Sequence, residues 1–309
     1  MRVAIIGLGG VGGFYGGKLA LTYSDHPEHK IFFVARGDHL QEIRTNGLLV
    51  ITKEGNFTAK PSHATDDPME LGHLDLIILS VKGYDLEKAA QMIRDNIDDN
   101  TVLIPLLNGV NNAEILKGIL SKGIIMNGCV YISTQIVRPG VVEHVGGAGK
   151  LFFGPTEGSV EPYRKIETLM KDAGIHAVLS DNITVDVWSK YIFIGPLASV
   201  TSMTGMTLGA VMEKEEYQKM MEGMMKEIKM IADSEGIALP ENIVQKSLEL
   251  TSSFPYETKS SLQLDFERGK KAEVETFTGF VVKKARGLGI KTPLHDEAYS
   301  VLKNKAKEN

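Results

Sequence analysis

The sequence has little of what marks disulfide-stapled or metal-stabilised proteins. Its 309 residues include a single cysteine, Cys129, so no disulfide can form within the chain. Cys129 lies in the apolar run 124–132, which predicts a buried and inert thiol. The 8 histidines are scattered, and no Cys/His cluster has the spacing of zinc ligands, so we expect no metal site.

Neither positive charge nor hydrophobicity is concentrated in one part of the chain, as it would be in a protein that binds nucleic acid or a membrane. The chain has 34 Lys and Arg against 39 Asp and Glu, a net charge of −5, without a basic face or tail. We therefore expect no nucleic-acid partner. No run approaches the roughly 18 consecutive apolar residues of a membrane span. The apolar run at 3–6 is too short for a signal peptide, so we expect a cytoplasmic protein without a membrane partner.

Glycine is in excess, and it is unevenly distributed. Of 32 glycines, 22 lie in residues 1–160, whereas 8 of the 13 methionines lie at 203–230. The methionines recur at helical spacing, which favours core packing over a promiscuous groove. The length suits about two domains, and the two halves differ in composition.

Short β-branched runs alternate with helical patterns through the first half of the chain. The expected strands are 3–6, 31–34, 74–79, 102–105 and 124–130. The expected helices between them are 11–22, 39–46, 86–96 and 113–120. This alternation predicts βαβ units and a parallel sheet covered on both faces. Segments 140–145 and 151–154 should extend that sheet with antiparallel strands, before a helix at 162–172 and a strand at 176–179.

From residue 182 onward the strand pattern ends, and apolar residues recur at intervals of three and four. The expected helices are 185–203, 215–232, 242–250, 272–285 and one that begins at Pro293. The predicted fold class is α/β, with an N-terminal Rossmann-type doubly wound sheet and an all-α C-terminal domain. We place the dinucleotide-binding domain at 1–181 and the helical domain at 182–309.

A glycine-rich motif stands between the first expected strand and helix. The segment Gly7, Leu8, Gly9, Gly10, Val11, Gly12 fits G-x-G-x-x-G. Gly7 allows a tight turn, Gly9 lets the backbone approach a pyrophosphate, and Gly12 allows close helix–strand packing. The helix N-terminus offers its N–H groups to phosphates. The motif therefore predicts dinucleotide binding, with a purely structural turn as the alternative.

The end of the second strand discriminates between the two nicotinamide cofactors. An acidic side chain there would bind the ribose 2′-hydroxyl of NAD. This sequence has Arg36 instead, whose guanidinium suits the 2′-phosphate of NADP. Asp38 lies nearby, but it can cap the helix expected from His39. The pattern favours NADP(H).

Polar residues interrupt apolar surroundings at three further places. Lys82 and Asn108 follow two expected strands, where ligands of open α/β sheets bind. A solvated loop lysine and a turn asparagine are the alternatives. Lys190 interrupts the apolar helix that opens the second half, and it either extends outward or lines a cleft, where it would suit an acid that protonates a carbonyl oxygen. The polar stretches 259–265 and 269–275 read, unaided, as solvated charged surface.

Several motifs in order resemble the ketopantoate reductase (2-dehydropantoate 2-reductase) family. They are GLGGVG at 7–12, VK at 81–82, LLNGV at 106–110, PGVVEH at 139–144, WSK at 188–190, SSLQLD at 260–265, AEVE at 272–275 and ARGLGIKTP at 285–293. The resemblance covers nearly the whole chain. It implies NADPH-dependent reduction of 2-dehydropantoate to (R)-pantoate in pantothenate biosynthesis, in a cleft between a Rossmann domain and a helical domain.

The resemblance also implies roles for individual residues. Lys190 would be the general acid, and Glu273 would act with it at the substrate hydroxyl and the nicotinamide ribose. Asn108 would hold cofactor and substrate, and Ser261 the substrate carboxylate. The remaining cofactor contacts implied are Lys82, through its charge, and Thr134.

One departure from the family pattern bears on the substrate. The family commonly has asparagines one and two helical turns after the catalytic lysine, where this chain has Ile194 and Ala198. Their absence favours a less polar 2-oxo acid, unless Thr201 or Ser202 takes over the role. A non-enzymatic dinucleotide sensor is a further alternative. The helical half has apolar stripes that suit either packing within the domain or a homodimer.

Overall fold

The structure of the protein is a computed structural model, and it describes residues 1–308. The chain forms two compact units, one of residues 1–107 and 111–183, the other of residues 108–110 and 184 onward. The boundary predicted between 181 and 182 lies two residues before this division. The inclusion of 108–110 in the second unit was not predicted from the sequence.

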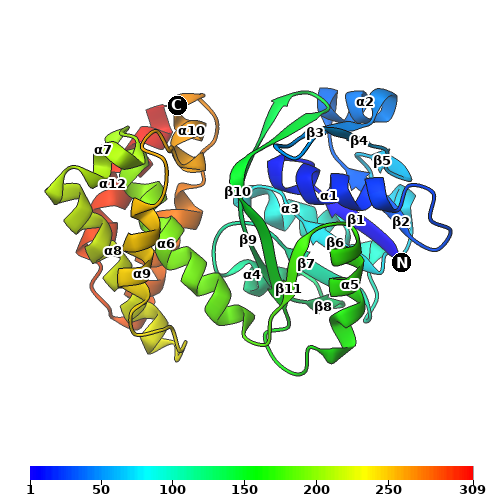
Figure 1. Cartoon of the computed structure of the whole chain (residues 1–309). Coiled ribbons are helices and arrows are strands. Elements are labelled where there is room, and N and C mark those ends of the chain that lie inside the picture. The colour runs from blue at the N-terminus through cyan, green and yellow to red at the C-terminus, as the bar shows by residue number, and fades with distance from the viewer. Residues whose placement is uncertain (309) are drawn as a thin grey trace. The chain divides into compact units, whose positions relative to one another are not determined.

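The first unit contains a six-stranded sheet in which every pair of neighbours is parallel. Its members are β1 (Arg2–Ile6), β2 (Lys30–Val34), β5 (His63–Thr65), β6 (Leu76–Leu79), β7 (Val102–Pro105) and β8 (Ile124–Ile125). The order β5-β2-β1-β6-β7-β8 is that of a doubly wound dinucleotide-binding sheet. The predicted α/β fold class is confirmed (Figure 1).

The predicted antiparallel extension of this sheet is wrong, because the strands concerned form a second sheet. It consists of β3 (Leu48–Ile51), β4 (Phe57–Ala59), β9 (Asn127–Arg138), β10 (Val141–Gly154) and β11 (His176–Leu179). β9 and β10 do pair antiparallel, but β10 also pairs parallel with β3 and β11. The expected strand 124–130 divides at Met126 between the two sheets.

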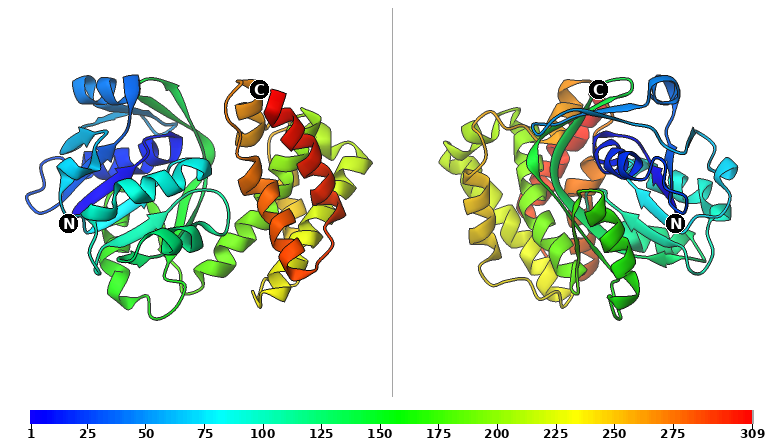
Figure 2. Two further views of the ribbon diagram at one scale, coloured as in Figure 1. Left: turned by 180° about the vertical axis from the view of Figure 1, so that it is seen from behind. Right: turned by 45° about the vertical axis from the view of Figure 1, so that its right-hand side comes forward.

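Helix α1 (Gly10–Thr22) lies between the two sheets (Figures 1 and 2). A Cβ at Gly16 would lie 2.9 Å from Ile5 of β1, and one at Gly13 would lie 2.6 Å from Val142 of β10. At Gly17 it would lie 2.7 Å from Val50 of β3. Glycine within a helix costs about 1 kcal/mol relative to alanine. Here it permits the backbone to approach both sheets, which explains part of the glycine excess.

The remaining helices of the first unit flank the sheets. They are α2 (Gly37–Asn46), α3 (Leu86–Met92), α4 (Asn112–Ile119) and α5 (Arg164–Asp172), with the 3₁₀ turns η1 (Pro68–Leu71), η2 (Gly83–Asp85), η3 (Arg94–Asn96) and η4 (Glu161–Tyr163). Cys129 is buried, as expected.

The regular elements of the second unit are all helices within its described residues. Its elements are α6 (Ile183–Thr204), which starts at the end of the first unit, α7 (Leu208–Met212), α8 (Glu215–Ser234), α9 (Ile243–Ser252), α10 (Ser261–Glu267), η5 (Glu275–Gly279), α11 (Phe280–Leu288) and α12 (Pro293–Glu308). Met220, Met221, Met224 and Met225 are buried in the core of this unit, as expected. No helix in the described chain has the length and hydrophobicity that a bilayer span needs.

A buried carboxylate fixes the start of α12 to α8. Glu227 of α8 accepts bonds from the backbone N–H groups of Leu294 and His295, at 2.9 and 3.1 Å. The Nδ1 atom of His295 lies 2.6 Å from the same carboxylate. His295 is fully buried, and burial lowers its pKa despite the neighbouring Glu227.

Acidification is expected to destabilise the helical unit through His295. Because the folded pKa of His295 lies below its unfolded value of about 6.5, the unfolded chain binds the proton first as the pH falls. This contribution to stability is full above about pH 6.5 and declines below it, by at most about 1.4 kcal/mol per pH unit. Thermal unfolding measured across this pH range should show that the stability of His295→Gln declines less steeply with falling pH than that of the wild type. The exposed His176→Gln is the control, and an unchanged slope in His295→Gln would contradict the assignment.

Candidate active site

Several of the predicted residues follow strands that end at one edge of the parallel sheet. β1 pairs with β2 on one side and with β6 on the other, so the strand order reverses beside β1. Gly7 follows β1, and Lys82 lies three residues beyond the end of β6. Ligands of doubly wound sheets bind at such a switch point, at the carboxyl ends of the strands.

The glycine motif forms a tight cradle at the start of α1. Gly7 has a φ of +92°, which favours glycine, and a Cβ at Gly12 would collide with the Gly7 carbonyl oxygen. At Gly9, by contrast, the nearest atom to a Cβ would be the Ser80 carbonyl oxygen at 4.0 Å. The N-cap of α1 has no side-chain hydrogen bond, and its first turn has no acidic residue. This end of α1 therefore has space and positive polarity for a phosphate.

Two hydroxyl side chains border the cradle. A Cβ at Gly10 would lie 2.5 Å from the Thr134 Oγ1 atom of β9, so Thr134 packs directly on the motif. The Ser80 Oγ atom is hidden from solvent, and within the described chain it has no hydrogen-bond partner. Ser80 lies beside Gly12, and we did not predict it as a site residue. Its signal in the sequence was a hydroxyl at the end of an otherwise apolar strand. An orphaned hydroxyl and an open Gly9 fit a bound dinucleotide.

Arg36 stands at the N-cap of α2, just after β2. Its side chain is 79% exposed and forms an ion pair of 3.2 Å with Asp85, at the end of η2. The expectation that Asp38 caps this helix is wrong, because α2 begins at Gly37 and Asp38 lies within its first turn. Lys82 is the half-buried N-cap residue of η2, and its carbonyl oxygen accepts the Asp85 N–H at 2.8 Å.

In the helical unit, Lys190 and Asn108 are in contact. The Lys190 Nζ atom donates a hydrogen bond of 2.9 Å to Asn108 Oδ1, across 82 residues of sequence. Lys190 comes from α6, and Asn108 belongs to the short stretch 108–110 that joins this unit. Both side chains are half-buried. A lysine held at an amide oxygen can present its remaining N–H bonds to another acceptor.

Glu273 lies in the same unit, before an unusual turn of helix. Its residue is 6% exposed, and its carbonyl oxygen accepts the N–H groups of Thr276 and Phe277 at 3.1 and 3.2 Å. The expected helix 272–285 begins here with the π-helical segment η5, a form that is frequent at functional sites. Ser261 is the exposed first residue of α10.

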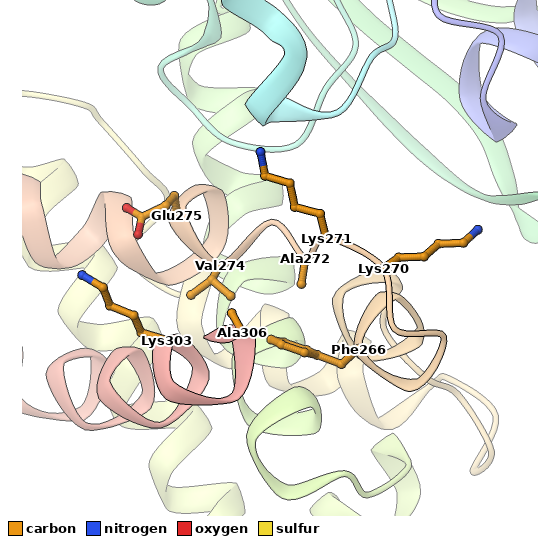
Figure 3. Close-up of a pocket in the computed structure, with 8 residues that line it drawn as sticks. All are labelled: Phe266, Lys270, Lys271, Ala272, Val274, Glu275, Lys303 and Ala306. Carbon is orange, nitrogen blue, oxygen red and sulfur yellow. The ribbon is translucent and has the colours of Figure 1, made fainter. Parts of the chain in front are cut away.

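A pocket of about 340 Å³ adjoins the sequence neighbours of Glu273 (Figure 3). Its lining residues are Phe266, Lys270, Lys271, Ala272, Val274, Glu275, Lys303 and Ala306. Burial acts to raise the pKa of Glu275, but bonds from Lys283 at 2.5 Å and Tyr299 at 2.6 Å lower it overall. Figure 3 shows the ends of Lys270 and Lys271 directed apart, so these ammonium groups do not converge on one ligand.

Two family models match most of the chain. The model described as Ketopantoate reductase PanE/ApbA matches residues 3–158, and the model of its C terminal part matches residues 182–306. The chain belongs to the ketopantoate reductase family. The resemblance expected from the motifs is therefore confirmed.

Individual relatives match over nearly their full length. The uncharacterized oxidoreductase YkpB of Bacillus subtilis is 27% identical over 303 residues, which cover 98% of either chain. The PanE/ApbA family ketopantoate reductase from Ralstonia eutropha JMP134 has a TM-score of 0.90 and 28% identity, over 100% of this chain and 99% of that one. The 2-dehydropantoate 2-reductase from Porphyromonas gingivalis W83 is 30% identical, with a TM-score of 0.83 over 98% and 99% of the chains. The family is thus one of oxidoreductases.

Proposed function

We propose that this protein reduces 2-dehydropantoate to (R)-pantoate with NADPH, as a step of pantothenate (vitamin B5) biosynthesis. The observation that carries the proposal is the bond between Lys190 and Asn108. Each was singled out separately as a polar side chain in apolar surroundings, and the fold brings them together. Membership of the ketopantoate reductase family supports the same reaction.

The residues of the helical unit supply proton and orientation. The Lys190 ammonium donates a proton to the carbonyl oxygen of the substrate. The hydrogen bond to Asn108 Oδ1 holds this ammonium in place. In this proposal Ser261 binds the substrate carboxylate, and Glu273 accepts hydrogen bonds from the substrate hydroxyl and from the nicotinamide ribose. A fixed donor raises the rate because it removes the search for a reactive orientation.

The first unit would hold the cofactor. Gly7 to Gly12 and the first turn of α1 would bind the pyrophosphate, with Ser80 and Thr134 beside it. Arg36 would pair with the 2′-phosphate, and Lys82 would add positive charge. When bound, the reduced nicotinamide supplies the hydride that the keto carbon accepts.

Replacing Lys190 by alanine should remove the proton donor. We expect kcat with 2-dehydropantoate and NADPH to fall by about 10²–10⁴-fold, while the affinity for NADPH is retained. The exposed Lys246→Ala in α9 is the matched control and should keep wild-type kcat. A wild-type kcat in Lys190→Ala would contradict the role assigned to Lys190. If the wild-type protein binds NADPH but reduces no 2-oxo acid, the result would instead favour a non-enzymatic dinucleotide sensor.

Replacing Arg36 by alanine should weaken the binding of NADPH but not that of NADH. A charge-assisted bond to a phosphate is worth about 1.5–3 kcal/mol, so KM for NADPH should rise roughly 10- to 100-fold. KM for NADH should stay within about twofold, because NADH has no 2′-phosphate. Steady-state kinetics with both cofactors check this, with the exposed Arg94→Ala as control. Equal effects on both cofactors would refute the 2′-phosphate role.

A second candidate function is reduction of a less polar 2-oxo acid by the same residues. Ala198 is fully buried in an apolar cluster with Leu262 and Phe277, and Ile194 packs against that cluster. Thr201 and Ser202, considered as substitutes for the missing amides, are also fully buried. The Thr201 hydroxyl bonds to Ser260 at 2.9 Å. Ile194 and Ala198 thus offer no polar group for a substrate hydroxyl, and the Thr201 hydroxyl is already bonded within the protein.

Two substrates that differ only in a hydroxyl separate the candidates. They are 2-dehydropantoate and 3,3-dimethyl-2-oxobutanoate, compared by kcat/KM with NADPH. A site that hydrogen-bonds the hydroxyl should prefer 2-dehydropantoate by more than about 100-fold, whereas an apolar wall discriminates less. Ile194→Asn should move the ratio towards 2-dehydropantoate under the second candidate. A preference above about 100-fold in the wild type would exclude that candidate.

A further inference from the structure

A buried tyrosine adjoins Lys190 on helix α6 and has no role in the reaction proposed above. Tyr191 is 1% exposed, and burial raises the pKa of its hydroxyl. Its ring packs edge-on against Trp188 and Phe280, with centroids 6.3 and 5.9 Å away. The hydroxyl is therefore held in one place, whereas Lys190, the preceding residue, is half-buried and bonds to Asn108.

The Tyr191 hydroxyl binds the π-helical segment that follows Glu273. It lies 2.9 Å from the carbonyl oxygens of both Thr276 and Phe277, so its one proton is shared between them. The N–H groups of these same two residues donate to the Glu273 carbonyl oxygen. Thr276 and Phe277 thus form a two-residue link between Tyr191 and the backbone of Glu273.

A second bond ties η5 to α6. The hydroxyls of Ser199 and Thr278 lie 2.9 Å apart, and both residues are fully buried. Ser199 also donates to the Gly195 carbonyl oxygen at 2.8 Å, so in the shared bond Thr278 is the donor. Buried hydroxyls with their bonds made are costly to disrupt, which keeps the segment in one arrangement.

We propose that Tyr191 is a positioning residue, which fixes Glu273 relative to Lys190 by holding the carbonyls of Thr276 and Phe277. The inference rests on the proposed function, because it takes Lys190 as the proton donor and Glu273 as the group that binds the substrate hydroxyl and the nicotinamide ribose. One helix thereby carries the proton donor and, on the next residue, the group that sets the place of its partner. Thr278 and Ser199 act in the same way at the next residue of η5.

The test compares variants that remove a single hydroxyl. Tyr191→Phe keeps the ring and loses the bond, and Thr278→Val keeps the volume and loses the hydroxyl. Both should lower kcat by about 10- to 100-fold, because small misplacements of reacting groups cost rates of that order. NADPH affinity should stay within about twofold of wild type. Thr278→Ser keeps the hydroxyl and should restore most of the activity, and Tyr217→Phe on α8 is the matched tyrosine control.

The kinetic isotope effect, measured with NADPH deuterated at the transferred hydrogen, does not depend on how much of the protein is folded. Tyr191→Phe and Thr278→Val should raise it, because misplacement makes the chemical step slower and more fully rate-limiting. An unchanged isotope effect, with kcat either at the wild-type value or reduced only by the loss of folded protein, would overturn the inference.

If Tyr191→Phe does not fold, the pair Thr278→Val and Thr278→Ser decides by the same criteria. A wild type inactive with every 2-oxo acid would overturn the proposed function and this inference together, whereas an active wild type with unaffected variants overturns only the inference.

Discussion

The proposed active site depends on one hydrogen bond, from the Lys190 ammonium to the Asn108 amide oxygen. A lysine side chain has four rotatable bonds and, left in solvent, samples many positions. The bond to Asn108 confines it, and Asn108 lies in the stretch 108–110, which belongs to the helical unit although its neighbours in sequence belong to the first unit. The proton donor is thereby set by a contact between segments that are far apart in the chain.

Close packing governs the first unit in the same way that hydrogen bonds govern the second. The glycines of α1 allow the helix to lie against β1 on one side and against β3 and β10 on the other. This places the start of α1 at the carboxyl end of β1, where Gly9 leaves space and Thr134 packs on Gly10. The phosphate cradle is consequently a product of the packing of two sheets on one helix, rather than of a loop alone.

The sequence predicted those parts of the structure that depend on local pattern. The parallel strands, the helical second half and the glycine motif follow from periodicity and from spacing. The second sheet was missed because β3 pairs with β10, and Leu49 lies opposite Val141 only after nearly a hundred intervening residues. Tyr191, Ser199 and Thr278 resemble ordinary helix residues in sequence, and only tertiary hydrogen bonds give them significance. Glu273 and Ser261 were predicted as site residues only through the family motifs, because the polar segments that contain them otherwise indicated solvated charged surface.

The most direct test of the central claim is a double-mutant cycle on Lys190 and Asn108. Single-turnover reduction of 2-dehydropantoate by NADPH would be measured for the wild type, Lys190→Ala, Asn108→Ala and the double variant. If Asn108 acts by holding the proton donor, its removal should cost little once Lys190 is absent, and the double variant should lose about as much as Lys190→Ala alone. Losses that multiply in the double variant would contradict the account, because they would show that the two residues act independently.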